Sequence, residues 1–338
     1  MKERFTSSAP GRLCLFGEHQ DYLGLPVIAM AMNRRCRLAF SPVDEGRVQV
    51  TSAILGPMDA FHLKAIRGEE HTDPLRHALA RLLEEFESSE VGGWHVHIDS
   101  DVPVRAGCSS STALMTAWVA GWLQILQGGF DPSDVVRRSH RYEVLDFNGA
   151  GGDMDQFACG HGGLNRFGAG EPCALHQPGG VFVLGDSGQP KDTQGHLRRC
   201  RDGRIPLMPY LDSPQPQLSP DELALLEGTK VNRDLEAHWA GVMMVEPASG
   251  KEMGAGLNRH HAVLRDVLGL STPRIEAMLD NARSAGAWGG KINGSGGGGC
   301  CFALCPEEKV EDVIDAMKAA GAAGAWRVEM DEGVTCTV

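Results

Sequence analysis

A cluster of hydrogen-bonding side chains follows an apolar run near the N-terminus. The stretch GRLCLFGEHQDYLG, residues 11–24, places Glu18, His19 and Asp21 directly after residues typical of a buried strand. A strand that only turned at the surface would use Gly, Asn or Pro there, and it would gain nothing from adjacent glutamate and histidine. The pattern therefore indicates side chains that are directed at a ligand.

A second stretch has the features of an anion-binding helix start. The sequence VPVRAGCSSSTALMTAWVAGWL, residues 102–123, places Gly107 and three serines immediately before a long apolar helix. Free backbone N–H groups at such a helix start attract a phosphate, and serine hydroxyls can add ligands for its Mg²⁺. A plain helix N-cap with two spare serines explains this stretch equally well when it stands alone.

A third stretch carries candidate catalytic carboxylates. The sequence GGDMDQFACGHGGLNRFG, residues 151–168, places Asp153 and Asp155 in a glycine-rich approach to an apolar segment. A carboxylate there could take the proton from a hydroxyl nucleophile or orient that hydroxyl for attack. An aspartate that only forms a turn is the alternative.

A glycine-rich stretch near the C-terminus has a spacing found in dinucleotide sites. The sequence NGSGGGG, residues 293–299, contains G-x-G-x-x-G at Gly294, Gly296 and Gly299. In a dinucleotide-binding fold this pattern follows a strand and opens a helix, whereas here a helix precedes it and a strand follows, so we reject that fold. A loop that lets the backbone approach a phosphate or substrate remains possible, and so does a flexible hairpin.

The elements that must position these groups divide into an N-terminal and a C-terminal set. The hydrophobic periodicity predicts a mixed α+β domain first. Its strands are expected at 11–17, 27–40, 46–53 and 94–99, and its helices at 73–86, 110–126 and 132–147, the last capped by Asp131 and carrying Glu143 near its end. A strand at 179–188 and a loop at 189–216, rich in proline, glycine and charge, follow a domain boundary that we place near 170–190.

The second half is predicted to be another α+β unit. Ser219 and Thr272, each followed by proline, are expected to cap helices. An apolar strand at 300–305, a helix at 306–319 and a strand at 325–330 complete this unit.

The composition limits the class of protein. The chain has 338 residues, enough for two medium domains, and 42% hydrophobic with 22% charged residues is typical of a folded protein. The net charge of −12 argues against a nucleic acid as the main partner, because such binding draws on clustered lysine and arginine. Ten cysteines without metal-binding spacing, and no targeting or membrane-spanning pattern, predict reduced thiols in a cytoplasmic protein with no membrane partner.

Taken in order, the four motifs resemble those of the GHMP family of small-molecule kinases, which includes galactokinase, homoserine kinase, mevalonate kinase and phosphomevalonate kinase. They are GRLCLFGEHQDY, PVRAGCSSSTAL, GGDMDQF and GGKINGSGGGGC, and the resemblance covers nearly the whole chain. It implies an α+β, two-domain GHMP kinase fold, divided into residues 1–178 and 179–338, with the active site in the interdomain cleft. It also implies transfer of the γ-phosphoryl group of ATP, with Mg²⁺, to a hydroxyl of a small molecule.

The resemblance also assigns roles to individual residues. Asp155 matches the catalytic carboxylate, and Arg12 matches the cation that keeps it ionised and stabilises charge on the transferring group. Glu18, His19 and Asp21 match the sugar-binding residues of the galactokinase signature. The residues expected to hold ATP are Arg105, Ala106, Gly107, Cys108, Ser109, Ser110, Ser111 and Gly296, and those expected to hold Mg²⁺ are Ser110 and Glu143.

The chemistry of the first cluster favours a sugar as the acceptor. A polyol site needs crowded donors and acceptors, because each unpaired buried polar group costs about 1–3 kcal/mol. An acid such as mevalonate would call for cations instead. We therefore predict a galactokinase-like enzyme that acts on the anomeric hydroxyl and makes a sugar 1-phosphate.

Two other functions stay open at this stage. The stretch GGLNRF, residues 162–167, looks more like the heptose kinase branch, and KINGSGGGGC is closer to mevalonate and heptose kinases than to galactokinase. A heptose kinase or a mevalonate-type kinase is thus the alternative enzyme. A non-catalytic regulator that binds sugar and ATP is the alternative of another class, and the presence of Arg12, Asp155 and the serines favours an enzyme over it.

Overall fold

The computed structural model describes residues 3–43, 46–53, 56, 60–63, 65–66, 72–86, 91–168, 170–213 and 217–338, and within these residues two sheets organise the fold. The larger sheet has the order β12-β1-β2-β5-β3-β4, with β6 beside β2 and β7 beside β6. Its strands are β1 (Phe5–Phe16), β2 (Val27–Val43), β3 (Arg47–Ser52), β4 (Phe61–His62), β5 (Gly93–Ser100), β6 (Leu164–Phe167), β7 (Cys173–Ala174) and β12 (Thr335–Thr337). Neighbouring strands are antiparallel except β3 and β5, which run parallel.

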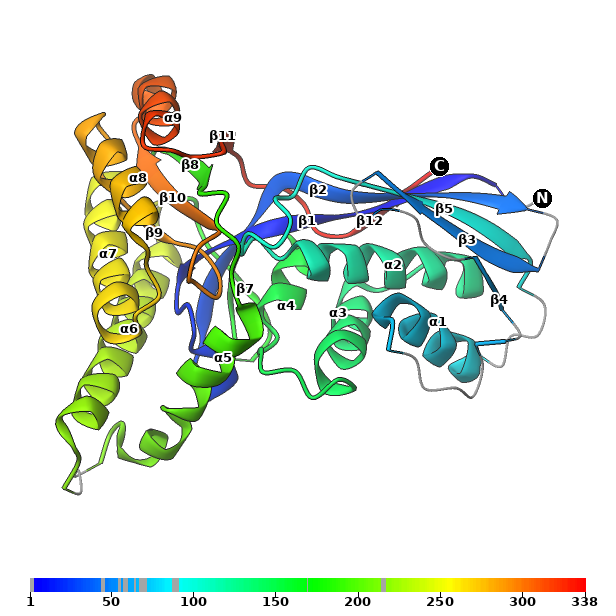
Figure 1. The fold of residues 1–338 in the computed structure, drawn as a ribbon, viewed down its shortest axis with the longest axis horizontal. Coiled ribbons are helices and arrows are strands. Elements are labelled where there is room, and N and C mark those ends of the chain that lie inside the picture. The colour runs from blue at the N-terminus through cyan, green and yellow to red at the C-terminus, as the bar shows by residue number, and fades with distance from the viewer. Residues whose placement is uncertain are drawn as a thin grey trace.

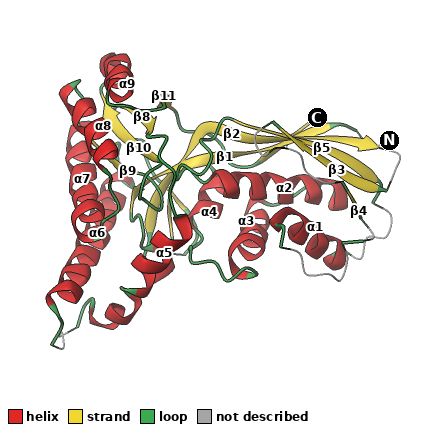
Figure 2. Cartoon of the chain, viewed as in Figure 1, coloured by secondary structure: helices red, strands yellow, loops and turns green. Residues whose placement is uncertain are grey.

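Helices cover one face of the larger sheet (Figures 1 and 2). They are α1 (Pro74–Glu85), α2 (Ser110–Gln127), α3 (Pro132–His140) and α4 (Met154–His161). Helix α2 is apolar on nearly all sides because it packs against β1 and β2 on one side and against α1 and α3 on the other. Its buried Trp118 and Trp122 lie against Phe40 of β2. This packing fixes the first turn of α2, where the serine-rich motif lies.

The smaller sheet has the order β11-β8-β10-β9 and is antiparallel throughout. Its strands are β8 (Val181–Asp186), β9 (Gly289–Ile292), β10 (Cys300–Cys305) and β11 (Gly324–Val328). Helices α7 (Gly250–Ala262), α8 (Pro273–Ser284) and α9 (Val310–Ala319) pack on it, and α6 (Pro220–Met243) packs against α7. Figure 1 shows this assembly at the end of the long strands β1 and β2.

A shared core joins the two parts of the fold. Leu13, Leu15 and Phe16 of β1 are fully buried in one cluster with Trp239 of α6 and Phe302 of β10. The rings of Phe16 and Trp239 stack with their centroids 5.7 Å apart. The end of β1, which leads directly into the Glu18 cluster, is therefore held by residues from both halves of the chain.

The local signals for helix starts are confirmed. Ser219 and Glu222 form the reciprocal bonds of a capping box at α6, and the side chains of Asp131 and Thr272 cap α3 and α8. All ten cysteines are free thiols. Among the described residues, no helix combines the length and apolarity that crossing a membrane requires.

The prediction that residues 189–216 form a loop is wrong for most of that segment. It contains α5 (Thr193–Asp202) and the 3₁₀ helix η3 (Ile205–Tyr210), while residues 214–216 lie outside the described residues. The side chain of Asp192 caps α5 by accepting a hydrogen bond from the Gly195 N–H at 2.9 Å, and buried Cys200 and Leu207 anchor the segment. Capping and burial thus outweigh the proline and charge that suggested a loop.

Two further boundaries differ from the sequence expectation. The helix expected over 132–147 ends at His140 and continues as a π-helical turn, Arg141–Leu145, which carries Glu143. The last strand, β12, returns to the larger sheet and pairs with β1, although it lies in the C-terminal half of the chain. For the rest of the chain we propose the division at residues 178 and 179.

Candidate active site

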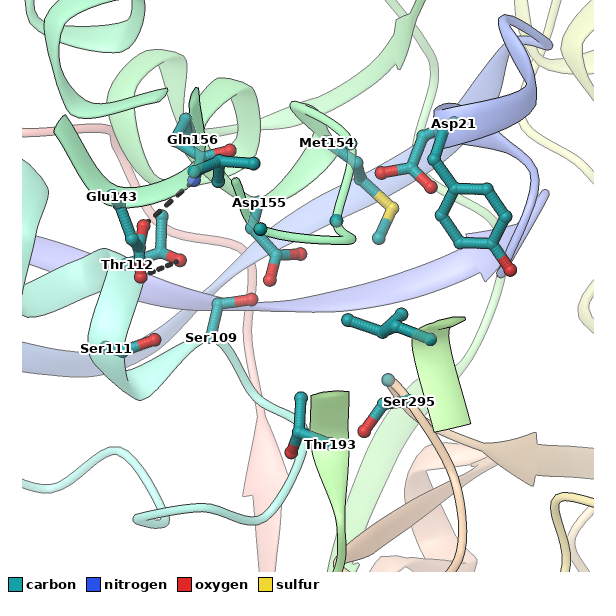
Figure 3. A pocket seen from close by; sticks show the side chains of 18 of the residues that line it. Asp21, Ser109, Ser111, Thr112, Glu143, Met154, Asp155, Gln156, Thr193 and Ser295 are labelled. Atoms are coloured by element: carbon teal, nitrogen blue, oxygen red, sulfur yellow. Dashed lines mark hydrogen bonds between the residues drawn. The ribbon is translucent and has the colours of Figure 1, made fainter. Parts of the chain in front are cut away.

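A cavity between the two parts of the fold collects residues from all four motifs (Figure 3). The lining residues come from β1 and the segment after it, the turn before α2 and the start of α2, the π-helical turn and the start of α4, the connection before α5 and the start of α5, and the glycine-rich segment. They include Arg12, Glu18, His19, Asp21, Tyr22, Arg105, Gly107, Ser109, Ser110, Ser111, Thr112, Glu143, Asp155, Gln156, Lys191, Thr193, Gln194, Gly294 and Ser295. Ala106, Cys108 and Gly296, which were expected to hold ATP, do not line it.

Arg12 and Asp155 form an ion pair at this cavity. Both Nε and Nη2 of Arg12 approach Oδ1 of Asp155, at 2.8 and 2.7 Å, and Nη1 donates to the Gly107 carbonyl. The arginine is buried, whereas the carboxylate side chain is 31% exposed and faces the cavity (Figure 3). Asp155 lies in the first turn of α4, where the helix dipole favours a negative charge. The pair thus offers an oriented carboxylate that a substrate hydroxyl can reach.

A second ion pair fixes Glu18. Lys291 of β9, completely buried, donates to Oε2 of Glu18 at 2.7 Å and to the Cys14 carbonyl at 2.8 Å. The buried carboxylate is thereby neutralised and held in one orientation, which satisfies the rule that buried charges are paired. Glu18 still lines the cavity, so its remaining acceptor sites are available to a ligand.

His19 is positioned by a relay of hydrogen bonds. Arg204 donates from Nη2 to the Tyr22 hydroxyl at 2.7 Å and to the His19 carbonyl, and the Tyr22 hydroxyl lies 2.8 Å from Nδ1 of His19. Burial, followed by the nearby Arg204 charge, holds the pKa of His19 well below its ordinary value, so the imidazole is neutral. Because arginine can only donate, the relay favours a hydrogen on His19 Nε2. The ring also interacts with the backbone of Ser295, which acts to raise its pKa, and it lines the cavity, where Nε2 can serve a ligand.

Asp21 has an unusual ionisation for a carboxylate. Burial, followed by the charge of nearby Asp155, raises the pKa of Asp21 to about 7, although the Tyr22 N–H acts in the opposite direction. Near neutral pH this side chain therefore populates both the acid, which donates a hydrogen bond, and the carboxylate, which only accepts. Both forms can pair with a hydroxyl of an acceptor molecule.

Asp21→Asn is expected to change the pH dependence of stability. A carboxyl whose pKa is raised on folding stabilises the protein at pH values below its unfolded pKa, and that contribution is lost as the pH rises towards 7. The asparagine variant has no carboxyl to ionise at this position, so it does not lose stability in this way. In ligand-free protein the unfolding free energy of the variant minus that of the wild type should therefore increase by about 2 kcal/mol between pH 5 and pH 8. Urea unfolding at the two pH values measures it. For the exposed Asp315→Asn, the difference in unfolding free energy from the wild type should be equal at the two pH values. An effect of Asp21→Asn that did not change with pH would contradict the raised pKa of Asp21.

The start of α2 is arranged to receive an anion. Arg105, Gly107 and Ser109 have positive φ angles of 54°, 85° and 61°, which produce a sharp turn before the helix. Ser109 is the N-cap residue of α2 but makes no capping bond, and its buried hydroxyl has no partner among the described residues. The plain N-cap explanation therefore does not fit this stretch. Its free donors suit a phosphate.

Glu143 provides an oxygen ligand beside these donors. Its carboxylate accepts hydrogen bonds from Gln156 Nε2 at 2.9 Å and from the Thr112 hydroxyl at 3.2 Å (Figure 3). Burial raises the pKa of Glu143, and hydrogen bonding by Ser111 opposes that rise. Among the serines of this motif, Ser111 is thus the one whose hydroxyl acts on Glu143, alongside Thr112, whereas the Ser110 hydroxyl accepts a bond from the Arg105 N–H at 3.4 Å.

These oxygen ligands fit Mg²⁺ bound together with a nucleotide. Mg²⁺ is usually held by one or two carboxylates plus substrate phosphates rather than by a complete protein cage. Within the ranges that the structure describes, no three acidic, histidine or cysteine side chains gather as a cage. Glu143 is one carboxylate beside a serine hydroxyl and a phosphate site, which matches an Mg²⁺ ion held jointly by the protein and the nucleotide phosphates.

The glycine-rich segment packs against the start of α2. A Cβ atom at Gly294 would lie 2.6 Å from the Gly107 carbonyl oxygen, and one at Gly299 would lie 2.5 Å from that of Ala106. Asn293 adds a hydrogen bond of 2.9 Å from Nδ2 to the Gly107 carbonyl. The glycines are thus needed for close approach of two backbone segments, which holds the motifs of the two halves together.

Sequence reasoning missed several residues of the site. Three of them lie in the segment predicted to be a loop, namely Lys191, Thr193 and Gln194. Two others do not line the cavity but hydrogen-bond to residues that do: Lys291 to Glu18 and Arg204 to Tyr22. Lys291 stands within the quoted motif, and its position in an otherwise apolar buried strand was a usable signal. Arg204 has no comparable local pattern.

Comparisons with known proteins show the family of this chain. Residues 74–163 match the GHMP kinases N terminal domain, residues 246–323 match GHMP kinases C terminal, and residues 1–42 match the galactokinase galactose-binding signature. A mevalonate kinase of Pyrococcus abyssi is 30% identical over 93% of this chain and 92% of its own.

Solved structures share the fold. A Lactococcus lactis galactokinase complexed with galactose superposes with a TM-score of 0.81 at 20% identity, covering 99% of this chain and 95% of its own. The Methanococcus jannaschii mevalonate kinase also has a TM-score of 0.81, at 16% identity, covering 98% and 99%.

Proposed function

Because this chain belongs to the GHMP kinases, phosphotransferases that act on an alcohol group of a small molecule, we propose that it transfers the γ-phosphoryl group of ATP to the anomeric hydroxyl of a sugar. The observation that carries this proposal is the group formed by Glu18, neutral His19 and Asp21 at the cavity that Asp155 faces. The match of residues 1–42 to a galactose-binding signature supports it. These side chains offer carboxylate acceptors and an imidazole donor, which suit several adjacent hydroxyls.

The geometry suggests a role for each side chain in the reaction. Asp155 would accept the proton of the acceptor hydroxyl, and Arg12 would hold that carboxylate while adding positive charge beside the phosphate site. The backbone N–H groups and hydroxyls at the start of α2 would bind the phosphates. Mg²⁺, held by Glu143 with Ser111 or Ser110, would supply charge neutralisation to the phosphates. Little covalent chemistry is asked of the protein, so alignment and charge should dominate the rate.

A mevalonate-type kinase is the second candidate, and the Pyrococcus abyssi relative favours it. The composition of the first cluster argues the other way, because it presents no free cation to a carboxylate acceptor: His19 is neutral and Lys291 is already paired with Glu18. A heptose kinase needs the same hydroxyl-binding groups as other sugar kinases and is therefore a variant of the leading proposal.

A panel of acceptors tests the proposal. ADP release is measured with ATP, Mg²⁺ and each of several aldoses, heptoses, uronic acids and mevalonate, and phosphorus NMR identifies the phosphorylated hydroxyl. We expect turnover of at least one sugar, with phosphate on the anomeric oxygen. Turnover of mevalonate alone would overturn the sugar assignment. Binding of ATP and a sugar without any ADP release would instead indicate the non-catalytic regulator.

A further inference from the structure

Lys191 is a cation of the cavity that the proposed mechanism does not use. It lies in the connection between β8 and α5, is half-buried, and forms no hydrogen bond or ion pair with the described residues. The carboxylates that could neutralise it are already engaged, because Asp155 pairs with Arg12 and Glu18 with Lys291. The side chain is half-buried at the cavity and its ammonium group has no counter-charge among the described residues, so an anionic ligand in the cavity can supply one.

The ammonium group lies against the phosphate-binding turn. A Cβ atom at Gly107 would be only 2.8 Å from Nζ of Lys191. The carbonyl of the same glycine accepts hydrogen bonds from Arg12 and Asn293, and Arg12 in turn holds Asp155. Lys191 therefore meets the site where phosphate-binding backbone and catalytic carboxylate adjoin, which is where the terminal phosphate of ATP must lie for transfer.

The backbone on both sides of Lys191 is fixed. On one side, Gln189 accepts hydrogen bonds from the Gly299 N–H at 3.2 Å and, through its side chain, from the Thr272 hydroxyl at 2.7 Å. On the other, Asp192 caps α5. A Cβ atom at Gly298 would lie 2.9 Å from the Gln189 carbonyl, so the glycine-rich segment packs against this connection as well as against the phosphate-binding turn. The backbone that carries Lys191 is thus held in place beside the phosphate-binding turn before a ligand binds.

We propose that Lys191 is a catalytic residue whose ammonium group binds the γ-phosphoryl group of ATP and neutralises charge on it during transfer. In that step the acceptor oxygen bonds to the γ-phosphorus while the bond from phosphorus to the bridging oxygen of ADP breaks. The bonding electron pair leaves with ADP, and the acceptor proton passes to Asp155. Lys191 keeps its protons throughout and donates hydrogen bonds to the oxygens of the moving group.

The ionisation of Lys191 adds a testable pH dependence. Burial, followed by the nearby Arg12 charge, lowers the pKa of Lys191 below its ordinary value. The ammonium form is therefore lost at a lower pH than for an exposed lysine, and kcat should decline on the alkaline side. Cys108, Cys300, Glu18 and Arg12 are the titratable and charged groups that act on it.

Lys191→Met tests the proposal, with Lys191→Arg and the exposed Lys318→Met as comparisons. In the methionine variant we expect kcat to fall by about 100-fold, the affinity for ATP to fall by about 10-fold, and the affinity for ADP to change by less than about 2-fold, because only ATP carries the γ-phosphoryl group. The arginine variant should keep part of the activity and shift the alkaline decline of kcat to higher pH. Lys318→Met should match the wild type.

Two results would overturn the proposal. One is a methionine variant with wild-type kcat and wild-type preference for ATP over ADP. The other is an increase in KM for the acceptor alone, which would mean that Lys191 binds the acceptor. The comparison of ATP with ADP needs no acceptor, so the proposal can be judged even if the sugar assignment fails. If the methionine variant does not fold, the arginine variant decides through its pH profile.

Discussion

Asp155→Asn is expected to lower kcat by about 10³-fold while the protein stays folded and still binds ATP. Asparagine keeps the size and the hydrogen bond from Arg12 but cannot accept the acceptor's proton, and a positioned general base contributes about 10²–10⁴-fold. The carboxylate is 31% exposed at the cavity and the asparagine oxygen still accepts from Arg12, so the buried guanidinium loses its counter-charge but not its hydrogen bond, and we expect a modest loss of stability in a folded protein. Steady-state ADP release and isothermal titration with ATP measure the two effects.

The neighbouring aspartate provides a matched control. Asp153→Asn makes the same chemical change two residues away, at the N-cap of α4, and Asp153 does not line the cavity. Its kcat should stay within about 2-fold of the wild type. Near wild-type activity in Asp155→Asn would remove Asp155 from the mechanism. Loss of activity only in Asp153→Asn would mean that Asp153, and not Asp155, is the base.

The parts of the fold that were predictable depend on short-range signals. The capping residues Asp131, Ser219 and Thr272 act within one turn of helix, so their patterns are legible in the sequence and are confirmed. The fold class and the kinase family were expected from four motifs whose order and spacing are specific in combination. The family itself is shown by the relative that is 30% identical over 93% of this chain, together with the two domain matches. Helix α5 was missed because its stability depends on burying Cys200 against the rest of the protein.

The site could be predicted as a set of residues but not as a set of contacts. Lys191 reaches Gly107 and Lys291 reaches Glu18 across more than 80 positions in the sequence, and no local pattern encodes such pairs. The serine motif shows the same limit on a smaller scale. Successive side chains on a helix point in directions that differ by about 100°. Which serine hydroxyl contacts Glu143 therefore depends on the residue at which α2 begins. The assignment of the Mg²⁺ ligand to Ser110 or Ser111 depends on this direction of the side chains and stays a prediction.

Arg12→Met is expected to impair catalysis more than stability. The substitution removes both bonds to Asp155 and the bond to the Gly107 carbonyl, so the base loses its orientation and the phosphate site loses a cation. We expect kcat to fall by about 10³-fold, with Arg12→Lys intermediate because it keeps the charge but not the paired geometry. Because water reaches Asp155, the loss in unfolding free energy should be only about 1–3 kcal/mol.

Arg166→Met separates the two effects, because Arg166 makes a comparable pair away from the cavity. Its Nε and Nη2 donate to Glu236 at 2.7 and 3.1 Å, and the glutamate is 1% exposed. Removing this arginine leaves a buried charge unpaired, so it should cost about 3–5 kcal/mol, more than Arg12→Met, with kcat of the folded protein unchanged within about 2-fold. Urea unfolding and initial rates of the three variants measure both quantities. If activity followed stability across them, Arg12 would be a structural residue, and the electrostatic role assigned to it in phosphoryl transfer would have to be withdrawn.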